Sequence, residues 1–280
     1  MTEAELHDKI LGIATEAGAT HVAVATHDFE HDRRWSLNGD RWFHAASTIK
    51  VPVLLGVFDA IAQGRFEPHS RVHVRNRFLS VVDGMPFRVQ SGRDANSDVH
   101  TAIGSMLMAR ELAEHIIVTS SNLATNLLLD IVGVEHIQST LRRLDVDRGI
   151  DLRRGVEDEA AWETGINNRI TANGLADALR LIEERRAISP AASEQMLEIL
   201  HKQRFRSGIP AGLPDGARVA NKTGDMSTVS HDGGIVYLEG RAPYVIVVLT
   251  EWESDAGSRS RTIARISRAV FDYLMPEAGS

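Results

Sequence analysis

Hydrophobic residues recur at two different spacings along this chain, and each spacing predicts a kind of element. Near the N-terminus, Leu6, Ile10 and Ile13 are spaced for one face of a helix. Residues 21–26 instead alternate and are rich in Val and Ala, which predicts a strand. Residues 34–37 come just before a strong turn signal, so we expect the two segments to form a hairpin.

The same two patterns divide the rest of the chain into blocks. Helical spacing predicts helices at residues 3–17, 47–63, 106–117, 121–132, 134–144, 172–186, 190–201 and 256–274. Further strands are predicted at residues 217–223, 229–239 and 243–251. Strands at both chain ends predict an α/β fold of the α+β kind, with an antiparallel sheet flanked by helices and a helical subdomain. We expect residues 1–45 and 205–280 to form the sheet part and residues 46–204 the helical part, with a pocket at their seam.

Composition narrows the class of protein. At 280 residues with 43% hydrophobic residues, the chain has ample material for a large core. Its net charge of −7 gives no basic footprint, so we expect no nucleic-acid partner. The absence of cysteine excludes disulfides, thiol catalysis and thiolate metal sites. Residues 1–6 lack the features of a secretory signal and no stretch has the length of a transmembrane helix, so we expect a cytoplasmic protein without a membrane partner.

Three short motifs carry the candidate chemistry. They are Ser47-Thr48-Ile49-Lys50, Ser120-Ser121-Asn122 and Lys222-Thr223-Gly224. Residues three apart are neighbours on a helix, so Ser47 and Lys50 share one face. A serine hydroxyl is a weak nucleophile alone, and a desolvated or positively flanked lysine can serve as its base. The second motif adds a proton-relaying hydroxyl and an amide, and the third adds a cation and a strand edge. Together they supply what acyl transfer through a serine ester requires.

These motifs, in this order, resemble those of the penicillin-recognising serine hydrolases, and most closely those of the class A β-lactamases. The likeness extends to residues 43–53, 110–129 and 231–235 and covers residues 3–275. One position departs from the pattern, because Ser121 stands where the family usually has aspartate. The resemblance implies a β-lactamase-like fold, a small-molecule β-lactam substrate and no cofactor or metal. A monomer or weak homodimer is expected.

The resemblance also implies the steps of acylation. Ser47 attacks the carbonyl carbon and Lys50 takes its proton, directly or through water. Ser120 relays a proton to the leaving nitrogen, and Lys222 orients Ser120 and maintains a positive field.

A second set of residues is implied to bind the substrate. Asn122 bonds to the amide of the acyl side chain, and Lys222 and Thr223 of the Lys-Thr-Gly224 motif bind a substrate carboxylate. The oxyanion hole consists of the backbone N–H groups of Ser47 and Asp225. Relatives often add an arginine from the neighbouring strand, and Ser230 occupies that place here.

Release of the acyl group needs a base on an Ω-shaped loop, if the enzyme follows the class A β-lactamases. The corresponding segment runs from Arg153 to Glu159, and its acids are one residue out of step with the family's Arg-x-Glu. Glu157 is the first choice, Asp158 the second and Glu159 the third. The opposing interpretation is that all three are solvated loop charges.

The histidines suggest a different chemistry that we do not favour. His27-Asp28-Phe29-Glu30-His31 matches the H-x-x-E-H string of some zinc enzymes, but that motif needs a helix, and this segment follows a predicted strand. His69 and His73 have helical spacing but no third ligand. We therefore predict no metal site.

Three further hypotheses remain open from the sequence. Residues 75–101 look like an extended excursion that overhangs the cleft or forms a plain surface hairpin. The chain could be a cytoplasmic amidase, esterase or acyl-transferring enzyme that acts on a metabolite. It could also be a non-catalytic binding protein of the same fold, although the complete set of motifs argues against that.

Overall fold

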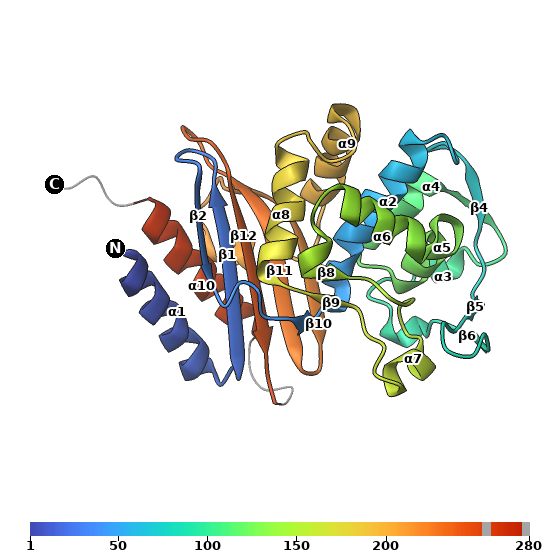
Figure 1. Cartoon of the computed structure of the whole chain (residues 1–280), viewed down its shortest axis with the longest axis horizontal. Coiled ribbons are helices and arrows are strands. Elements are labelled where there is room, and N and C mark those ends of the chain that lie inside the picture. Colours follow the sequence, from blue (N-terminus) through green and yellow to red (C-terminus); the bar gives the residue numbers. More distant parts are fainter. Residues whose placement is uncertain (254–258, 276–280) are drawn as a thin grey trace.

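A five-stranded antiparallel sheet forms the centre of the computed structural model, which describes residues 1–253 and 259–275 (Figure 1). Its strand order is β10-β11-β12-β1-β2. The strands are β1 (His21–Asp28), β2 (Arg33–Leu37), β10 (Arg218–Met226), β11 (Val229–Tyr237) and β12 (Tyr244–Glu251). The sheet joins strands from both parts of the chain, and the predicted hairpin is β1 paired with β2. The predicted fold class is therefore confirmed.

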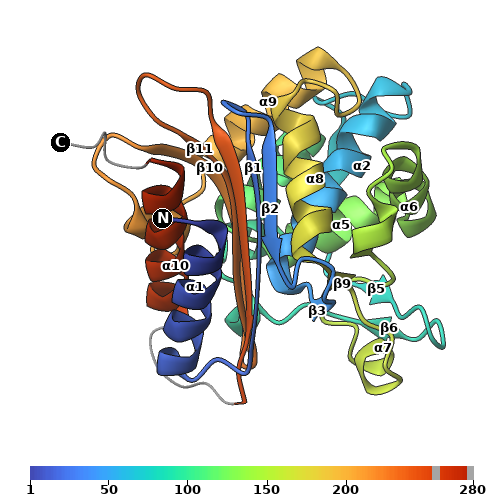
Figure 2. The ribbon, with the colours of Figure 1, turned by 60° about the vertical axis from the view of Figure 1, so that its left-hand side comes forward.

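Helices cover both faces of this sheet (Figure 2). On one face lie α1 (Glu3–Ala17) and α10 (Arg259–Leu274), and on the other lie α8 (Ala172–Glu183) and α9 (Pro190–His201). Alternation along β1 explains the arrangement, because successive side chains of a strand point to opposite faces. Val22 and Val24 belong to the core against α1 and α10, whereas Ala23 and Ala25 belong to the larger core on the other side.

The larger core is built around α2 (Lys50–Ala62), which is buried on nearly all its sides. Such a helix needs neighbours all round, and these are α4 (Ala109–Val118), α5 (Asn122–Val132), α6 (Val134–Arg143) and α8. Gly56 allows α6 to come close, because a Cβ at this position would lie 2.4 Å from a side-chain atom of Ile137.

Short elements connect these helices. Small strands pair as β3 (Phe43–His44) with β9 (Arg169–Ile170), β9 with β8 (Ile150–Asp151), β4 (Arg71–His73) with β7 (Met106–Met108), and β5 (Phe78–Leu79) with β6 (Pro86–Phe87). Short helices are α3 (Asp98–Thr101), α7 (Glu159–Glu163), and the 3₁₀ turns η1 (Ala46–Ile49), η2 (Ser91–Arg93), η3 (Asp147–Gly149) and η4 (Ile209–Gly212). The segment 75–101 thus contains a small hairpin and two short helical turns.

Several predicted boundaries differ from the structure. The helix expected at 106–117 begins at Ala109, because residues 106–108 pair with β4 and the backbone N–H of Met108 donates to Glu111 Oε2 at 2.7 Å. The helix expected from residue 47 begins as a 3₁₀ turn and becomes regular at Lys50. The expected start of the last helix at 256 lies outside the described residues. The subdomain boundaries stay a prediction.

In the described ranges, no helix combines the length and the apolar character needed to cross a membrane.

Candidate active site

Ser47 and Lys50 lie where the 3₁₀ turn η1 joins α2. The chain enters this turn through Ala46, which has the left-handed φ of 45°. A residue without glycine's freedom pays about 1–3 kcal/mol for such a conformation, so the surrounding structure must hold it in place. Lys50 then follows Ser47 by three residues, and its Nζ donates to Ser47 Oγ at 3.0 Å. The predicted pairing of hydroxyl and amine is present.

Lys50 is fully buried and is surrounded by oxygen acceptors. Its Nζ donates to Asn122 Oδ1 at 2.8 Å and to the carbonyl and Oγ of Ser120 at 2.6 and 3.2 Å. Burial lowers the pKa of Lys50 well below its ordinary value, and the charge of Lys222 lowers it further. Asp94 and Glu157 oppose this shift. A lysine that gives up its proton easily can accept one from a neighbouring hydroxyl.

Ser120 lies between the two lysines of the motifs. Its backbone is left-handed, with φ of 58°, and its hydroxyl accepts a hydrogen bond from Lys222 Nζ at 3.0 Å. Lys222 is fully buried, and burial lowers its pKa to about 7, against the opposing charges of Asp232 and Asp225. Ser47, Lys50, Ser120 and Lys222 therefore form one continuous set of contacts.

Strand β10 carries the third motif along the edge of the sheet, directly beside η1. A Cβ at Gly224 would lie 3.0 Å from the backbone nitrogens of Ser47 and Thr48, so only glycine fits without displacing the turn. Asp225 follows, and its Oδ1 accepts a hydrogen bond from Ser230 Oγ at 2.6 Å. Ser230 is thus buried against Asp225. It occupies the place where relatives often have an arginine.

Glu157 reaches the motif residues from the loop before α7. Its Oε1 accepts a hydrogen bond from Asn122 Nδ2 and its Oε2 accepts one from the backbone N–H of Gln90, both at 2.9 Å. Its backbone is left-handed, with φ of 62°.

The two other acids of this loop have different partners. Asp158 is buried and caps α7, accepting from the N–H groups of Ala161 and Val81 at 3.2 and 3.0 Å. Glu159 is exposed and pairs with Arg93 at 2.7 Å. Of the three candidates, only Glu157 contacts a residue of the three motifs among the described hydrogen bonds.

The loop that carries Glu157 is held by polar contacts on both sides. Asn126 donates from Nδ2 to the carbonyl of Val156 and accepts from its N–H, each at 2.8 Å. The buried Arg154 donates to the carbonyl of Ile166 at 2.9 Å and to Asn167 Oδ1 at 3.0 Å. These contacts fix the backbone that presents Glu157.

A cavity of about 790 Å³ opens at this place. Ser47, Asn122, Glu157 and Asp225 all line it, so the candidate nucleophile Ser47 and the candidate base Glu157 border the same space. This volume suits a small organic molecule.

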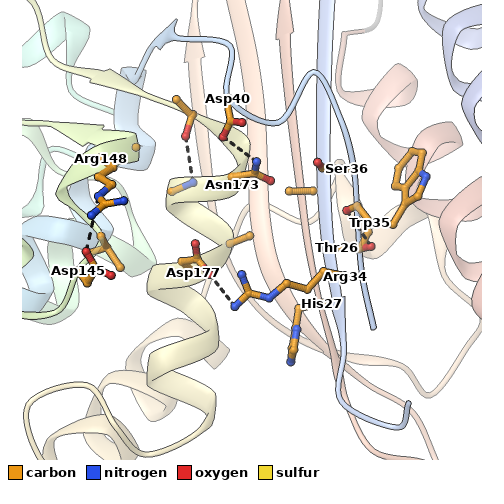
Figure 3. A pocket seen from close by; sticks show the side chains of 16 residues that line it. Thr26, His27, Arg34, Trp35, Ser36, Asp40, Asp145, Arg148, Asn173 and Asp177 are labelled. Carbon is orange, nitrogen blue, oxygen red and sulfur yellow. Dashed lines mark hydrogen bonds and ion pairs between the residues drawn. The ribbon is translucent and has the colours of Figure 1, made fainter. Parts of the chain in front are cut away.

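A second cavity of about 450 Å³ lies between β1, β2 and the start of α8 (Figure 3). Arg34 pairs with Asp177 at 3.0 Å and Arg148 with Asp145 at 3.8 Å, whereas Asp40 accepts a hydrogen bond from Asn173. It contains no motif residue.

The two histidines of the H-x-x-E-H string lie against different aspartates. His31 Nδ1 lies 2.9 Å from Asp28, whereas His27 Nε2 lies 3.8 Å from Asp32. His69 and His73 are exposed. Across residues 1–253 and 259–275, no three His, Cys, Asp or Glu side chains gather where they could hold a metal ion.

Two contributions to the site are not evident from the motifs. Asp94 accepts hydrogen bonds from the start of α5, and Gln90 bonds Glu157 through its backbone. Both belong to the excursion at residues 75–101, which therefore reaches the cleft. The only signal for Asp94 in the sequence is indirect, because Ser121 leaves the second motif without a carboxylate.

This chain is similar to known proteins of one family. The family model described as the beta-lactamase enzyme family matches residues 5–274. Beta-lactamase 1 of Streptomyces cacaoi is 29% identical over 206 residues, which are 69% of this chain and 63% of that protein, so the chain spans less than two-thirds of that relative's length.

Solved structures show the same fold. A beta-lactamase from Sphaerobacter thermophilus superposes with a TM-score of 0.81 and 24% identity, over 99% of this chain and 100% of that one. PBP-A superposes with a TM-score of 0.82 and 24% identity, over 96% of each chain. At this identity the likeness concerns the fold alone.

Proposed function

Because this chain belongs to the β-lactamase enzyme family, we propose that it is a serine hydrolase that opens β-lactam amides through an acyl ester of Ser47. The observation that carries the proposal is the 3.0 Å contact between Lys50 Nζ and Ser47 Oγ, in a buried site that lowers the pKa of the lysine. Neutral Lys50 accepts the serine proton while Ser47 Oγ bonds to the carbonyl carbon.

Collapse of the tetrahedral intermediate breaks the carbon–nitrogen bond, and the leaving nitrogen needs a proton. Ser120 is suited to supply it, because its hydroxyl lies within hydrogen-bond distance of both Lys50 and Lys222. Lys50, which now carries the proton taken from Ser47, replaces it through its contact with Ser120 Oγ, and charged Lys222 stabilises the negative charge that develops during the step.

Binding of the substrate follows from the cavity and from β10. The N–H groups of Ser47 and Asp225 serve as the oxyanion hole, supported by the close approach of Gly224 to η1. Thr223 and Lys222 attract a substrate carboxylate, and Asn122 bonds to the acyl amide.

Deacylation is assigned to Glu157. Its carboxylate faces the same cavity as Ser47 and is held by Asn122 and the backbone of Gln90. It takes a proton from the water whose oxygen attacks the ester carbonyl, and it gives that proton to Ser47 Oγ as the carbon–oxygen bond breaks, which releases the acid and regenerates Ser47. Asp158 and Glu159 are less suited, because one caps a helix and the other pairs with Arg93.

The proposal is tested by following the intact mass of the protein over time with a penicillin and a cephalosporin. A transient adduct, with consumption of the β-lactam, is the expected result. A lasting adduct would indicate capture without turnover, and no adduct would favour a metabolite amide or ester as the substrate. The cytoplasmic location, the absence of nucleic-acid and membrane partners and the monomeric or weakly dimeric state stay predictions.

A further inference from the structure

The first turn of α5 presents several hydrogen-bond donors that its own motif does not satisfy. The first N–H groups of any helix lack partners within the helix. Ser121 is the N-cap, and its Oγ accepts from the N–H of Ala124 at 3.2 Å. The N–H groups of Asn122 and Leu123 and the hydroxyl proton of Ser121 are left, and all three require an acceptor.

Asp94, from the segment after η2, accepts all three of these hydrogen bonds. Its Oδ1 accepts from the N–H of Asn122 at 2.9 Å. Its Oδ2 accepts from Ser121 Oγ at 3.0 Å and from the N–H of Leu123 at 3.1 Å. His100 Nε2 lies 3.2 Å from the same oxygen. The side chain of Asp94 has no exposed surface.

A carboxylate buried so completely is stable only where its charge is compensated. Three hydrogen bonds, the His100 contact and the positive end of the α5 dipole provide that compensation. The contacts lie 27 to 29 residues along the chain from Asp94, so they depend on the fold of the excursion and not on local sequence.

Asp94 bonds to residues 121–123, which overlap with and adjoin the two residues that bond to Lys50, Ser120 and Asn122. Asn122 accepts from Lys50 through its side chain while its own N–H donates to Asp94. Ser120, which precedes the capped residue, has the left-handed backbone that brings its carbonyl and hydroxyl to Lys50. Such a conformation persists only where its surroundings fix it.

We propose that Asp94 is a positioning residue for acylation, whose carboxylate replaces the aspartate that the motif lacks at Ser121. By fixing residues 121–123 it keeps Ser120 and Asn122 in contact with Lys50. The inference rests on the proposed role of Lys50 as the base for Ser47, and it gives the excursion at residues 75–101 a function in the site.

The charge of Asp94 has a second effect that distinguishes positioning from general stability. Burial and Lys222 lower the pKa of Lys50, whereas Asp94 and Glu157 raise it. Removal of one negative charge therefore moves the pKa of Lys50 further down. Lys50 becomes neutral at a lower pH, and the acid limb of the acylation profile shifts in the same direction.

The test compares Asp94→Asn with Asp98→Asn, an exposed aspartate of the same excursion whose carboxylate bonds only to Asn96 among the described contacts. The rate at which a fluorophosphonate labels Ser47 is measured from pH 5 to 9 by intact mass, with the melting temperature of each variant. Asp94→Asn should label at least about tenfold more slowly, with its acid limb at lower pH. Asp98→Asn should match the wild type. Unchanged labelling, or slower labelling with an unmoved limb, would overturn the proposal.

This probe separates the inference from the proposed function, since a fluorophosphonate reports Ser47 reactivity without a β-lactam. If Asp94→Asn does not fold, the double variant Asp94→Asn/Ser121→Asp replaces it. The double variant returns a carboxylate to the N-cap itself and should recover both the fold and most of the wild-type labelling rate. A double variant that also failed to fold, or that folded but labelled less than one tenth as fast as the wild type, would contradict the proposal.

Discussion

Glu157 Oε1 accepts a hydrogen bond at 2.9 Å from the Nδ2 of Asn122, whose Oδ1 accepts one at 2.8 Å from Lys50. One side-chain amide therefore joins the residue proposed to activate water with the residue proposed to activate Ser47. The charge of Glu157 also raises the pKa of Lys50 against the effect of burial. Acylation, which uses Lys50, and deacylation, which uses Glu157, are thus expected to share one electrostatic environment.

Replacement of the nucleophile should abolish covalent labelling. Ser47→Ala removes the hydroxyl but leaves the half-buried position filled, so the fold should persist. Intact mass spectrometry with a β-lactam and with a fluorophosphonate should detect no adduct, while circular dichroism matches the wild type. Labelling that continued at the wild-type rate would show that another residue is the nucleophile.

Loss of the proposed base should slow acylation of Ser47 without abolishing binding. Lys50→Ala is expected to reduce the acylation rate by about a hundred- to ten-thousandfold. Lys202→Ala is a matched control, because this exposed lysine pairs only with Glu114 among the described contacts. Stopped-flow acylation of both variants makes the comparison. A normal rate in Lys50→Ala would require a different base.

Titration of Lys222 should appear in the pH dependence of the acylation rate. Its pKa is lowered to about 7, chiefly by burial, so the charged form is lost as the pH rises through that value. If the charge supports proton transfer to the leaving nitrogen, the acylation rate should fall above pH 7. Lys222→Ala should lower the rate about a hundredfold and remove this falling limb. A limb that persisted near pH 7 in the variant would assign it to another group.

Gly224 should tolerate no side chain. A Cβ there lies 3.0 Å from the backbone nitrogens of Ser47 and Thr48, so Gly224→Ala should displace η1. We expect a loss of about 1–3 kcal/mol in the free energy of unfolding together with slower acylation. Gly12→Ala is the control, because nothing lies within 4 Å of its Cβ, and it should leave acylation unchanged. Denaturant melts measure the loss of stability and labelling rates measure acylation. A Gly224→Ala variant that matched the wild type in both would contradict the prediction.

The sequence alone predicted the five strands of the main sheet, most of the longer helices and the three motifs, because periodicity and motif order depend on local patterns. It could not decide among the acids of the loop before α7. That choice depends on the left-handed backbone of Glu157, which directs its side chain toward Asn122. The role of Asp94 was also out of reach, because it arises only when the excursion folds against α5.

The lifetime of the acyl-enzyme in Glu157→Gln tests directly whether this residue activates the deacylating water. This variant keeps a side chain of the same shape but cannot take a proton from water. Intact-mass time courses with benzylpenicillin would follow it beside the wild type and Glu159→Gln, whose glutamate pairs with Arg93. Acylation should stay near the wild-type rate in all three, and only Glu157→Gln should remain acylated, as a burst followed by a stall. Turnover by Glu157→Gln at the wild-type rate would show that a group other than Glu157 activates the water.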